Sequence, residues 1–239
     1  MAQEEMSRAM FRWYVHFDVF AGLVSGNGTI MGKEWYETIY LHCAQEAQNN
    51  PEDLNWKYVE RISFCQHVAA EAAVLFAQNN RGELMEEDFD ARCAHLETLM
   101  RSFEHSFHPS LLNPTKFIKD FTGAPPRDPD DIVDPYDPKF MYGGDLWPTN
   151  FAQLDVMSTT MMFLHGRAIA KQTTPPPEVV DMAYKICKMF EAIQIYPQSP
   201  PGALLGAHTQ LGMAMLYLPK DQRHTIWCRK KLALVESLG

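Results

Sequence analysis

The feature that most constrains the fold is a helical period of apolar residues along nearly the whole chain. In the first 24 residues, large apolar side chains recur at steps of three or four: Met6, Met10, Trp13, Phe17, Phe20 and Val24. These steps place them on one face of an α-helix. No useful length of sequence alternates apolar and polar residues as a half-buried strand would. The pattern therefore predicts an all-α fold.

Cap and turn signals divide this pattern into eight or nine helices. Ser25-Gly26-Asn27-Gly28 ends the first helix, and Asn50-Pro51 is typical of the start of the third. The stretch 202–218 carries no charge, so we expect that helix to be buried on most sides. The predicted helices cover 6–24, 33–48, 51–80, 86–107, 149–168, 173–193, 202–218 and 220–237.

Residues 123–139 interrupt the helical pattern. Their sequence, GAPPRDPDDIVDPYDPK, contains five prolines and five aspartates. It has too little apolar surface to fold alone and too many prolines for a helix. We expect an exposed acidic loop, which could separate two domains. Because the helices on both sides are unusually apolar, we favour a single multi-helix domain over residues 1–239.

Composition excludes several classes of protein. The 21 basic and 30 acidic residues leave a net charge of −9, which argues against nucleic-acid binding by this segment. The five well-separated cysteines indicate free thiols in a reducing compartment. The N-terminal residues lack the apolar region of a signal peptide, and the longest uncharged stretch contains prolines. We therefore expect no association with a membrane.

No catalytic or metal-binding motif stands out. The turn GNGTIMGKE lacks the glycine spacing of a phosphate loop and is interpreted as a helix-ending turn. His105 and His108 lie three residues apart, but we favour helix-end histidines over metal ligands. His208, within the uncharged helix, is interpreted as a buried, hydrogen-bonded core residue. We predict that the chain is not an enzyme and holds no cofactor or metal.

The methionines allow two interpretations. The chain has 14 of them, and Met157, Met161, Met213 and Met215 lie in predicted apolar helices. Methionine fills irregular gaps in cores and also lines adaptable binding surfaces, so both a core and a pocket role stay open. The large side chains that we expect in one continuous core are Trp13, Phe17, Phe20, Leu211, Met215 and Trp227.

Asp18 is the most informative polar residue. Between Trp13 and Val24 only His16, Asp18 and Gly22 interrupt an apolar sequence. A buried carboxylate without a partner is costly, so Asp18 needs a cation or several donors. Arginine binds a carboxylate at two points, which favours an ion pair with Arg229 in the last helix, or alternatively with Arg167.

Two blocks of sequence resemble the fungal-specific transcription factor domain. The first is WYVHFDVFAGLVSGNG, followed by KEWY at 33–36. The second is PPGALLGAHTQLGMAMLYLPKDQRHTIWCRKKLALVESLG at 200–239. Together with the intervening helices, the resemblance covers most of the chain. It implies the all-α regulatory region of a nuclear regulator of the zinc binuclear cluster family.

The resemblance also implies partners, and the sequence departs from the family pattern in one respect. Such a region acts through the transcription machinery or regulatory proteins, and a small-molecule effector or a homodimer would also fit. The six-cysteine zinc module of the family is missing, so zinc is expected only in that module. The chain is then either a fragment or a regulator-like protein that does not bind DNA alone. The alternatives to an interaction domain are an effector sensor on the same scaffold and an α-helical enzyme with an unrecognised site.

Overall fold

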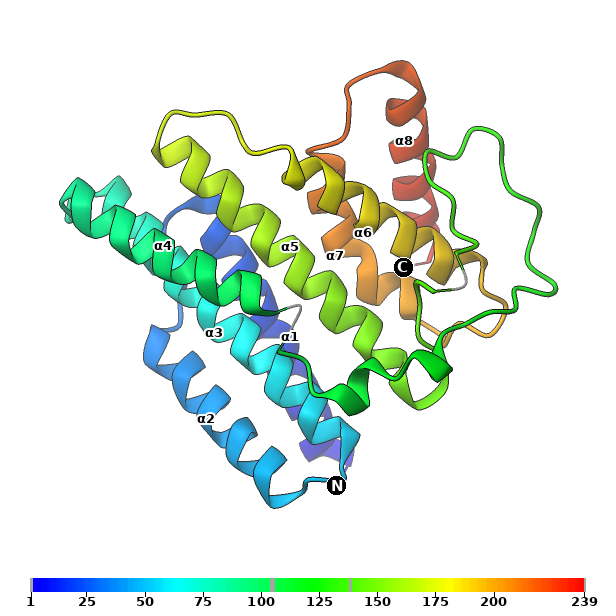
Figure 1. Cartoon of the computed structure of the whole chain (residues 1–239), viewed down its shortest axis with the longest axis horizontal. Helices are drawn as coiled ribbons and strands as arrows, with labels where there is room; N and C mark the ends of the chain where they lie inside the picture. Colours follow the sequence, from blue (N-terminus) through cyan, green and yellow to red (C-terminus); the bar gives the residue numbers. More distant parts are fainter. Residues whose placement is uncertain (1, 104–105, 138, 239) are drawn as a thin grey trace. The chain divides into compact units, whose positions relative to one another are not determined.

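A computed structural model describes residues 2–103, 106–137 and 139–238, with side chains in the first helix described from Tyr14 onward (Figure 1). The chain is about 70% helical, and the described part contains no strand beyond one isolated bridge between Phe117 and Tyr142. The predicted all-α fold is therefore confirmed. The α-helices in this part are α1 (Ala2–Ser25), α2 (Lys33–Asn49), α3 (Leu54–Asn80), α4 (Glu86–Ser102), α5 (Trp147–Ala170), α6 (Glu178–Ile195), α7 (Ala203–Met215) and α8 (Gln222–Ser237).

Local chemistry explains where the helix ends differ from the predicted ranges. Helix α3 begins at Leu54 rather than near Pro51, because the Asp53 side chain accepts the Asn55 amide and caps the helix. Three prolines at 175–177 delay the start of α6 to Glu178. Between α4 and α5 the chain forms the short 3₁₀ turns η2 (Pro109–Leu112), η3 (Pro114–Lys116) and η4 (Gly144–Leu146).

The chain forms two compact units. Unit 1 comprises Met1–His108 and Met162–Pro176, and unit 2 comprises Pro109–Met161 and Pro177–Gly239. Helix α5 contributes residues to both units, and the loop at 123–139 lies inside unit 2 rather than between the units. A single domain over residues 1–239 stays a prediction.

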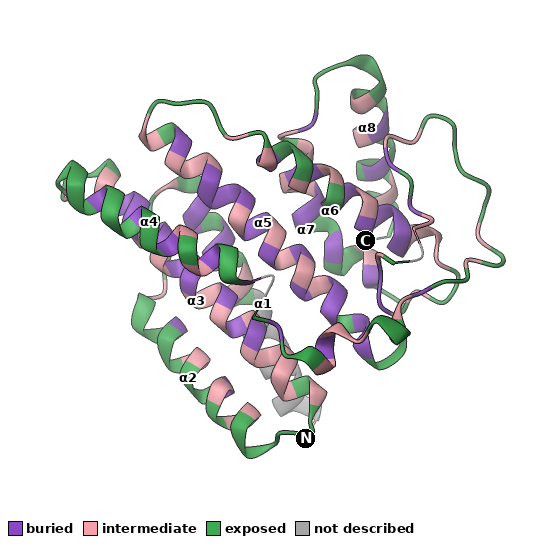
Figure 2. Cartoon of the chain, in the orientation of Figure 1, coloured by how far each residue is buried: buried purple, intermediate pink, exposed green. Residues whose placement is uncertain are grey.

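Unit 1 is built around α3. Helices α1, α2 and α4 each pack against it, and small residues let them approach closely. The buried residues of α3 include Ala69, Ala70, Ala72, Ala73 and Phe76 (Figure 2). From the α5 segment of this unit, Gly166 faces the Phe76 ring, and a Cβ at that glycine would lie 2.8 Å from Phe76 Cε2. The core of unit 1 therefore depends on small side chains at helix contacts.

Unit 2 is built around the apolar face of α6. The predicted inward residues of this helix are all buried: Val179, Ala183, Ile186, Phe190 and Ile193. Helix α7 packs on α6 and contacts α8. Burial of α7 is confined to one side, so the prediction for its other faces is wrong. His208 and Leu205 are exposed there, because only the face with Ala207, Leu211 and Ala214 meets its neighbours.

The predicted core is confirmed in part. Phe20, Leu211 and Trp227 are buried, and Met215 is half-buried. Phe17 is 55% exposed, so its predicted burial is wrong. The buried face of α1 passes through Val15, Val19 and Leu23 instead, which turns Phe17 outward. The side chains of Met6, Met10 and Trp13 lie outside the described residues, and a single continuous core stays a prediction.

Two glycines test the packing of the helices. A Cβ at Gly22 of α1 would lie 2.9 Å from the backbone of Gly28, whereas a Cβ at Gly212 of α7 would meet no atom within 4 Å. We expect Gly22→Ala to lower the free energy of unfolding by about 1–3 kcal/mol through overpacking against backbone. Gly212→Ala should instead raise it by about 0.5–1 kcal/mol, because alanine favours the helix. Urea denaturation of both variants measures the difference, and equal effects would contradict the close contact.

Candidate functional site

A buried carboxylate organises the first turn of unit 1. Asp18 is 3% exposed on α1, and its Oδ1 accepts the Ile30 amide at 2.8 Å. Its Oδ2 accepts the Met31 amide at 2.9 Å and the Tyr36 hydroxyl at 2.7 Å. We call Asp18, Ile30, Met31 and Tyr36 the Asp18 latch. It ties the turn after α1, and the start of α2, back onto α1.

The local sequence makes this latch possible. Gly26 and Gly28 have φ angles of 65° and 85°, which reverse the chain after α1 and confirm the predicted helix-ending turn. Gly22 lies one helical turn after Asp18 on the same face, and its missing side chain leaves room for the Gly28 backbone. Burial, and then the hydrogen bond to Asp18, raise the pKa of Tyr36, so its hydroxyl stays a donor.

The predicted arginine partner of Asp18 is wrong, although the predicted burial is confirmed. Two amides and a phenol satisfy the carboxylate instead. Arg167 pairs with Glu97, which also accepts from Arg101. Arg229 is exposed on α8. The turn and the start of α2 together supply three donors to Asp18, so its burial needs no cation.

The latch is flanked by exposed apolar side chains. Tyr14, Phe17 and Val24 follow one another at steps of three and seven on α1, on a face next to that of Asp18. Ile30, whose amide binds Asp18, is 84% exposed, and Trp35, next to Tyr36, is 60% exposed. We call these five residues the apolar face of unit 1. Large apolar side chains that stay exposed are candidates for contact with a partner.

A second buried carboxylate lies in unit 2. Glu191 on α6 is 1% exposed, and its Oε1 is 2.6 Å from Lys231 Nζ of α8. The same oxygen accepts Trp227 Nε1 at 2.7 Å. Lys231 also donates to Gln194 Oε1 at 2.8 Å. Burial raises the pKa of Glu191, and the Lys231 ammonium and the Trp227 N–H oppose that shift. This pair fixes how α8 docks on α6.

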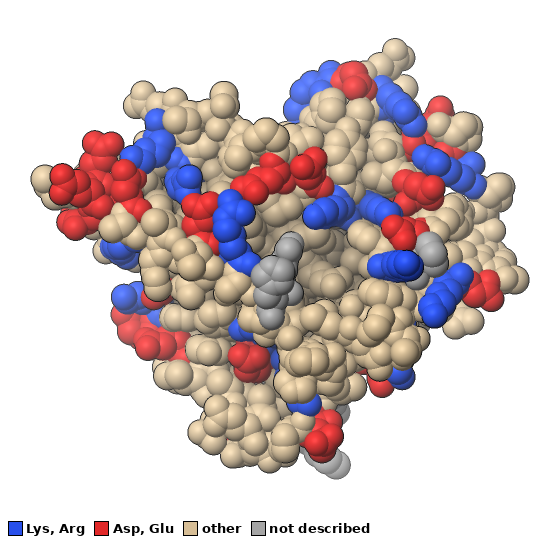
Figure 3. Space-filling view, viewed as in Figure 1, with Lys and Arg blue, Asp and Glu red and all other residues tan. Residues whose placement is uncertain are grey.

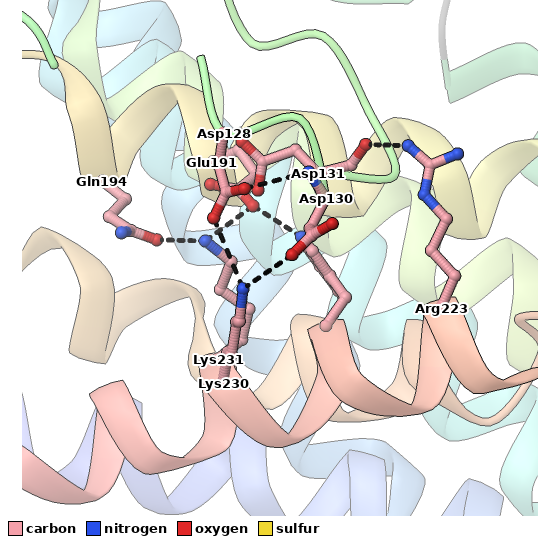
Figure 4. A network of polar contacts seen from close by, with 9 residues as sticks. Asp128, Asp130, Asp131, Glu191, Gln194, Arg223, Lys230 and Lys231 are labelled. Carbon is pink, nitrogen blue, oxygen red and sulfur yellow. Dashed lines mark hydrogen bonds and ion pairs between the residues drawn. The ribbon is translucent and has the colours of Figure 1, made fainter. Parts of the chain in front are cut away.

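The loop of residues 123–139, the acidic loop, lies over this pair (Figure 4). Asp128 and Asp130 meet Lys230 at 3.4 and 3.5 Å, and Arg223 donates to the Asp131 carbonyl at 2.5 Å. Asp137 pairs with Lys188 of α6 at 2.8 Å. The predicted exposed loop is confirmed for residues 125–130, whereas Val133 and Pro135 are buried and anchor its second half.

A third set of polar contacts links α6 to the start of α8. The Tyr184 hydroxyl lies 2.8 Å from His224 Nε2, and His224 Nδ1 lies 2.8 Å from Asp221 Oδ2. Asp221 also accepts the His224 amide and caps α8. Helix capping accounts for Asp221, and the contact between helices accounts for Tyr184. These contacts therefore serve to cap α8 and to hold it against α6.

The structure separates the four methionines predicted as core or pocket residues. Met161 is fully buried, which is the core role. Met157, Met213 and Met215 are half-buried, and their role in lining a pocket stays a prediction. In unit 2, sequence reasoning missed both the Glu191–Lys231 pair and the cations that hold the acidic loop. The contact between the loop and these cations could have been predicted from the five aspartates of the loop and the run of basic residues in the last helix.

No three His, Cys, Asp or Glu residues within the described chain are arranged to hold a metal ion. None of the helices described is long and apolar enough to cross a membrane. No family model, curated protein or solved structure matches the chain. Membership of the fungal-specific transcription factor domain family therefore stays a prediction from the residues that resemble it.

The Asp18 latch predicts an ordered set of stability losses. Asp18→Ala leaves three donors without their acceptor, so we expect the free energy of unfolding to fall by about 2–4 kcal/mol. Tyr36→Phe removes only one of the three bonds and should cost about 0.5–1.5 kcal/mol. Urea denaturation orders the two variants. A Tyr36→Phe loss as large as that of Asp18→Ala would contradict the role of the two amides.

The buried pair of unit 2 predicts a double-mutant result. Lys231→Met leaves Glu191 buried without its cation, so we expect a loss of about 3–5 kcal/mol in the free energy of unfolding. Adding Glu191→Gln removes the stranded charge while the amide oxygen still accepts the Trp227 N–H. The double variant should therefore be more stable than Lys231→Met alone. Thermal and urea denaturation test this, and a double variant less stable than the single one would refute it.

Proposed function

We propose that this chain is the regulatory and interaction domain of a fungal zinc-cluster-type transcriptional regulator. In this proposal it acts in the nucleus by binding partner proteins and does not itself bind DNA. The residues that resemble the family support it. The first block spans the second half of α1 and the start of α2, including Asp18 and Tyr36 of the latch, and the second block spans α7 and α8.

The observation that carries the proposal is the apolar face of unit 1. The Asp18 latch holds Ile30 and the start of α2 in fixed positions while leaving Ile30 and Trp35 exposed. A net charge of −9 opposes nucleic acid, and the visible surface shows acidic and basic atoms interleaved rather than one basic field (Figure 3). A face of aromatic and aliphatic side chains fits a protein partner, whose own apolar side chains would bury it.

A second candidate, an effector-sensing role, draws on one polar group in unit 2. Gln210 of α7 is 2% exposed and donates to Asp155 of α5 at 2.5 Å. Among the described residues, its Oε1 has no hydrogen-bond partner. Buried polar atoms are usually paired, so a donor on a small molecule would complete this group. A thermal-shift screen with metabolites tests this role. A metabolite that binds at Gln210 should raise the melting temperature of the chain but not that of a Gln210→Leu variant.

The interaction proposal predicts that the chain keeps its regulatory activity when it is fused to another DNA-binding protein. The full chain, fused to an unrelated DNA-binding domain in a fungal host, should raise or lower transcription of a reporter that carries the matching site. Replacing Ile30 and Trp35 with Ser should remove most of that effect, because it removes apolar contact area. Met85→Ser is the matched control, since Met85 is 75% exposed and lies in unit 1 outside the apolar face.

Two results would count against this proposal. A fusion that leaves the reporter unchanged in both directions would exclude a regulatory activity in that host. Tight and sequence-selective DNA binding by the isolated chain in a mobility-shift assay would contradict the expectation from its charge. Circular dichroism of the Ile30 and Trp35 variant checks that the helices are intact, so that a lost effect reports the surface rather than the fold.

A further inference from the structure

The acidic loop is seated on a set of cations that come from two helices of unit 2. Arg223 and Lys230 lie seven residues apart on α8, so they point to the same side about 10 Å from each other along the axis. Lys188 on α6 completes the set. We call these three residues the basic ridge. It is a local concentration of positive charge in a chain whose net charge is −9.

Polar contacts hold the first half of the acidic loop, and two of them reach its second half: Arg127 pairs with Asp134 at 3.6 Å, and the Tyr136 hydroxyl donates to the Pro125 carbonyl. Asp128 to Asp131 form a turn, in which the Asp131 amide donates to the Asp128 carbonyl and the Asp130 amide to the Asp128 carboxylate. Lys230 bridges the carboxylates of this turn, and Arg223 binds its last carbonyl. Residues 125–130 are all exposed, whereas the apolar anchors Val133 and Pro135 lie further along. Val133, Pro135 and the Asp137–Lys188 pair hold the second half, so the turn at 128–131 can leave Arg223 and Lys230 while Lys188 stays paired.

Ion pairs at an exposed surface are individually weak and are screened by salt. The side chains of Lys230, Asp128 and Asp130 are 50%, 47% and 73% exposed, so the turn is held by contacts of this kind. A ligand in competition with the turn needs to match only these few contacts. The contacts of the turn with Lys230 are therefore ones that a competing ligand could replace.

We propose that the basic ridge is a docking site for an acidic peptide segment of a partner protein, and that the acidic loop occupies this site in the free chain. The seated turn defines the chemistry of the ligand. Lys230 binds carboxylates of the turn and Arg223 binds its last backbone carbonyl, whereas Lys188 holds Asp137 of the anchored half. A peptide offers both groups on one chain, whereas Arg223 and Lys230, about 10 Å apart along α8, do not converge on one point as they would around a single phosphate. This site lies in unit 2, and its test does not depend on the reporter assay.

The test measures binding of a fluorescent peptide with the sequence of residues 123–139 to the full chain, by fluorescence anisotropy at low salt. In the free chain the turn competes with the peptide. An Asp128→Asn/Asp130→Asn variant, in which the turn loses its charges, should therefore bind the peptide at least tenfold more tightly than the unmodified chain. A peptide with all five aspartates replaced by asparagine should not bind.

Matched changes on α8 locate the site. In the Asp128→Asn/Asp130→Asn background, Arg223→Gln together with Lys230→Gln should weaken peptide binding at least tenfold. Arg229→Gln is the control, because Arg229 is exposed on the same helix and forms no ion pair with the described residues of the loop. It should change the affinity less than twofold. All these positions are exposed. A thermal melt of each variant checks that it is folded.

Three outcomes would overturn the proposal. The first is a loop variant that binds the peptide no more tightly than the unmodified chain. The second is an Arg229→Gln effect as large as that of the two ridge changes. The third is tighter binding of a single-stranded oligonucleotide than of the acidic peptide, which would assign the ridge to nucleic acid.

Discussion

The need to satisfy a buried carboxylate shapes both units of this chain. In unit 1, Asp18 on α1 is satisfied by two amides and a phenol, all of which belong to the turn and helix that follow it. In unit 2, Glu191 on α6 is satisfied by an ammonium and an indole N–H from α8. Each carboxylate draws a later segment against an earlier helix. The docking of α2 and of α8 is therefore specified by polar chemistry as well as by apolar burial.

The Asp18 latch and the Glu191–Lys231 pair depend on different features of the fold. The Asp18 latch is local and uses backbone donors, so it needs a turn of one shape, which the left-handed Gly26 and Gly28 provide. The Glu191–Lys231 pair spans 40 residues and uses side chains, so it needs α8 in one register. A shift of α8 by one residue would rotate Lys231 by about 100° away from Glu191. Burial would then leave both charges without a partner.

Helix number and inward faces could be predicted because apolar spacing reports them directly, as with the buried face of α6. Burial of Asp18 was predictable for the same reason, since its neighbours on α1 are apolar. Its partners were not, because a backbone amide belongs to every residue and no letter of the sequence marks Ile30 or Met31 as donors. Phe17 was misplaced because α1 has apolar residues on two faces, and only packing against α3 decides which one is buried.

The polar contacts of unit 2 differ in strength, because some are buried and others are exposed to solvent. Buried pairs such as Glu191–Lys231 are shielded from salt, whereas the contacts of Lys230 with Asp128 and Asp130 face solvent. Both kinds meet on one helix, since Lys230 and Lys231 are adjacent on α8 and point to different surroundings. The inner lysine fixes the helix, so the outer one would stay in place if the acidic turn left it. A rigid helix that carries a weakly held acidic turn is what a recognition surface with an exchangeable occupant requires.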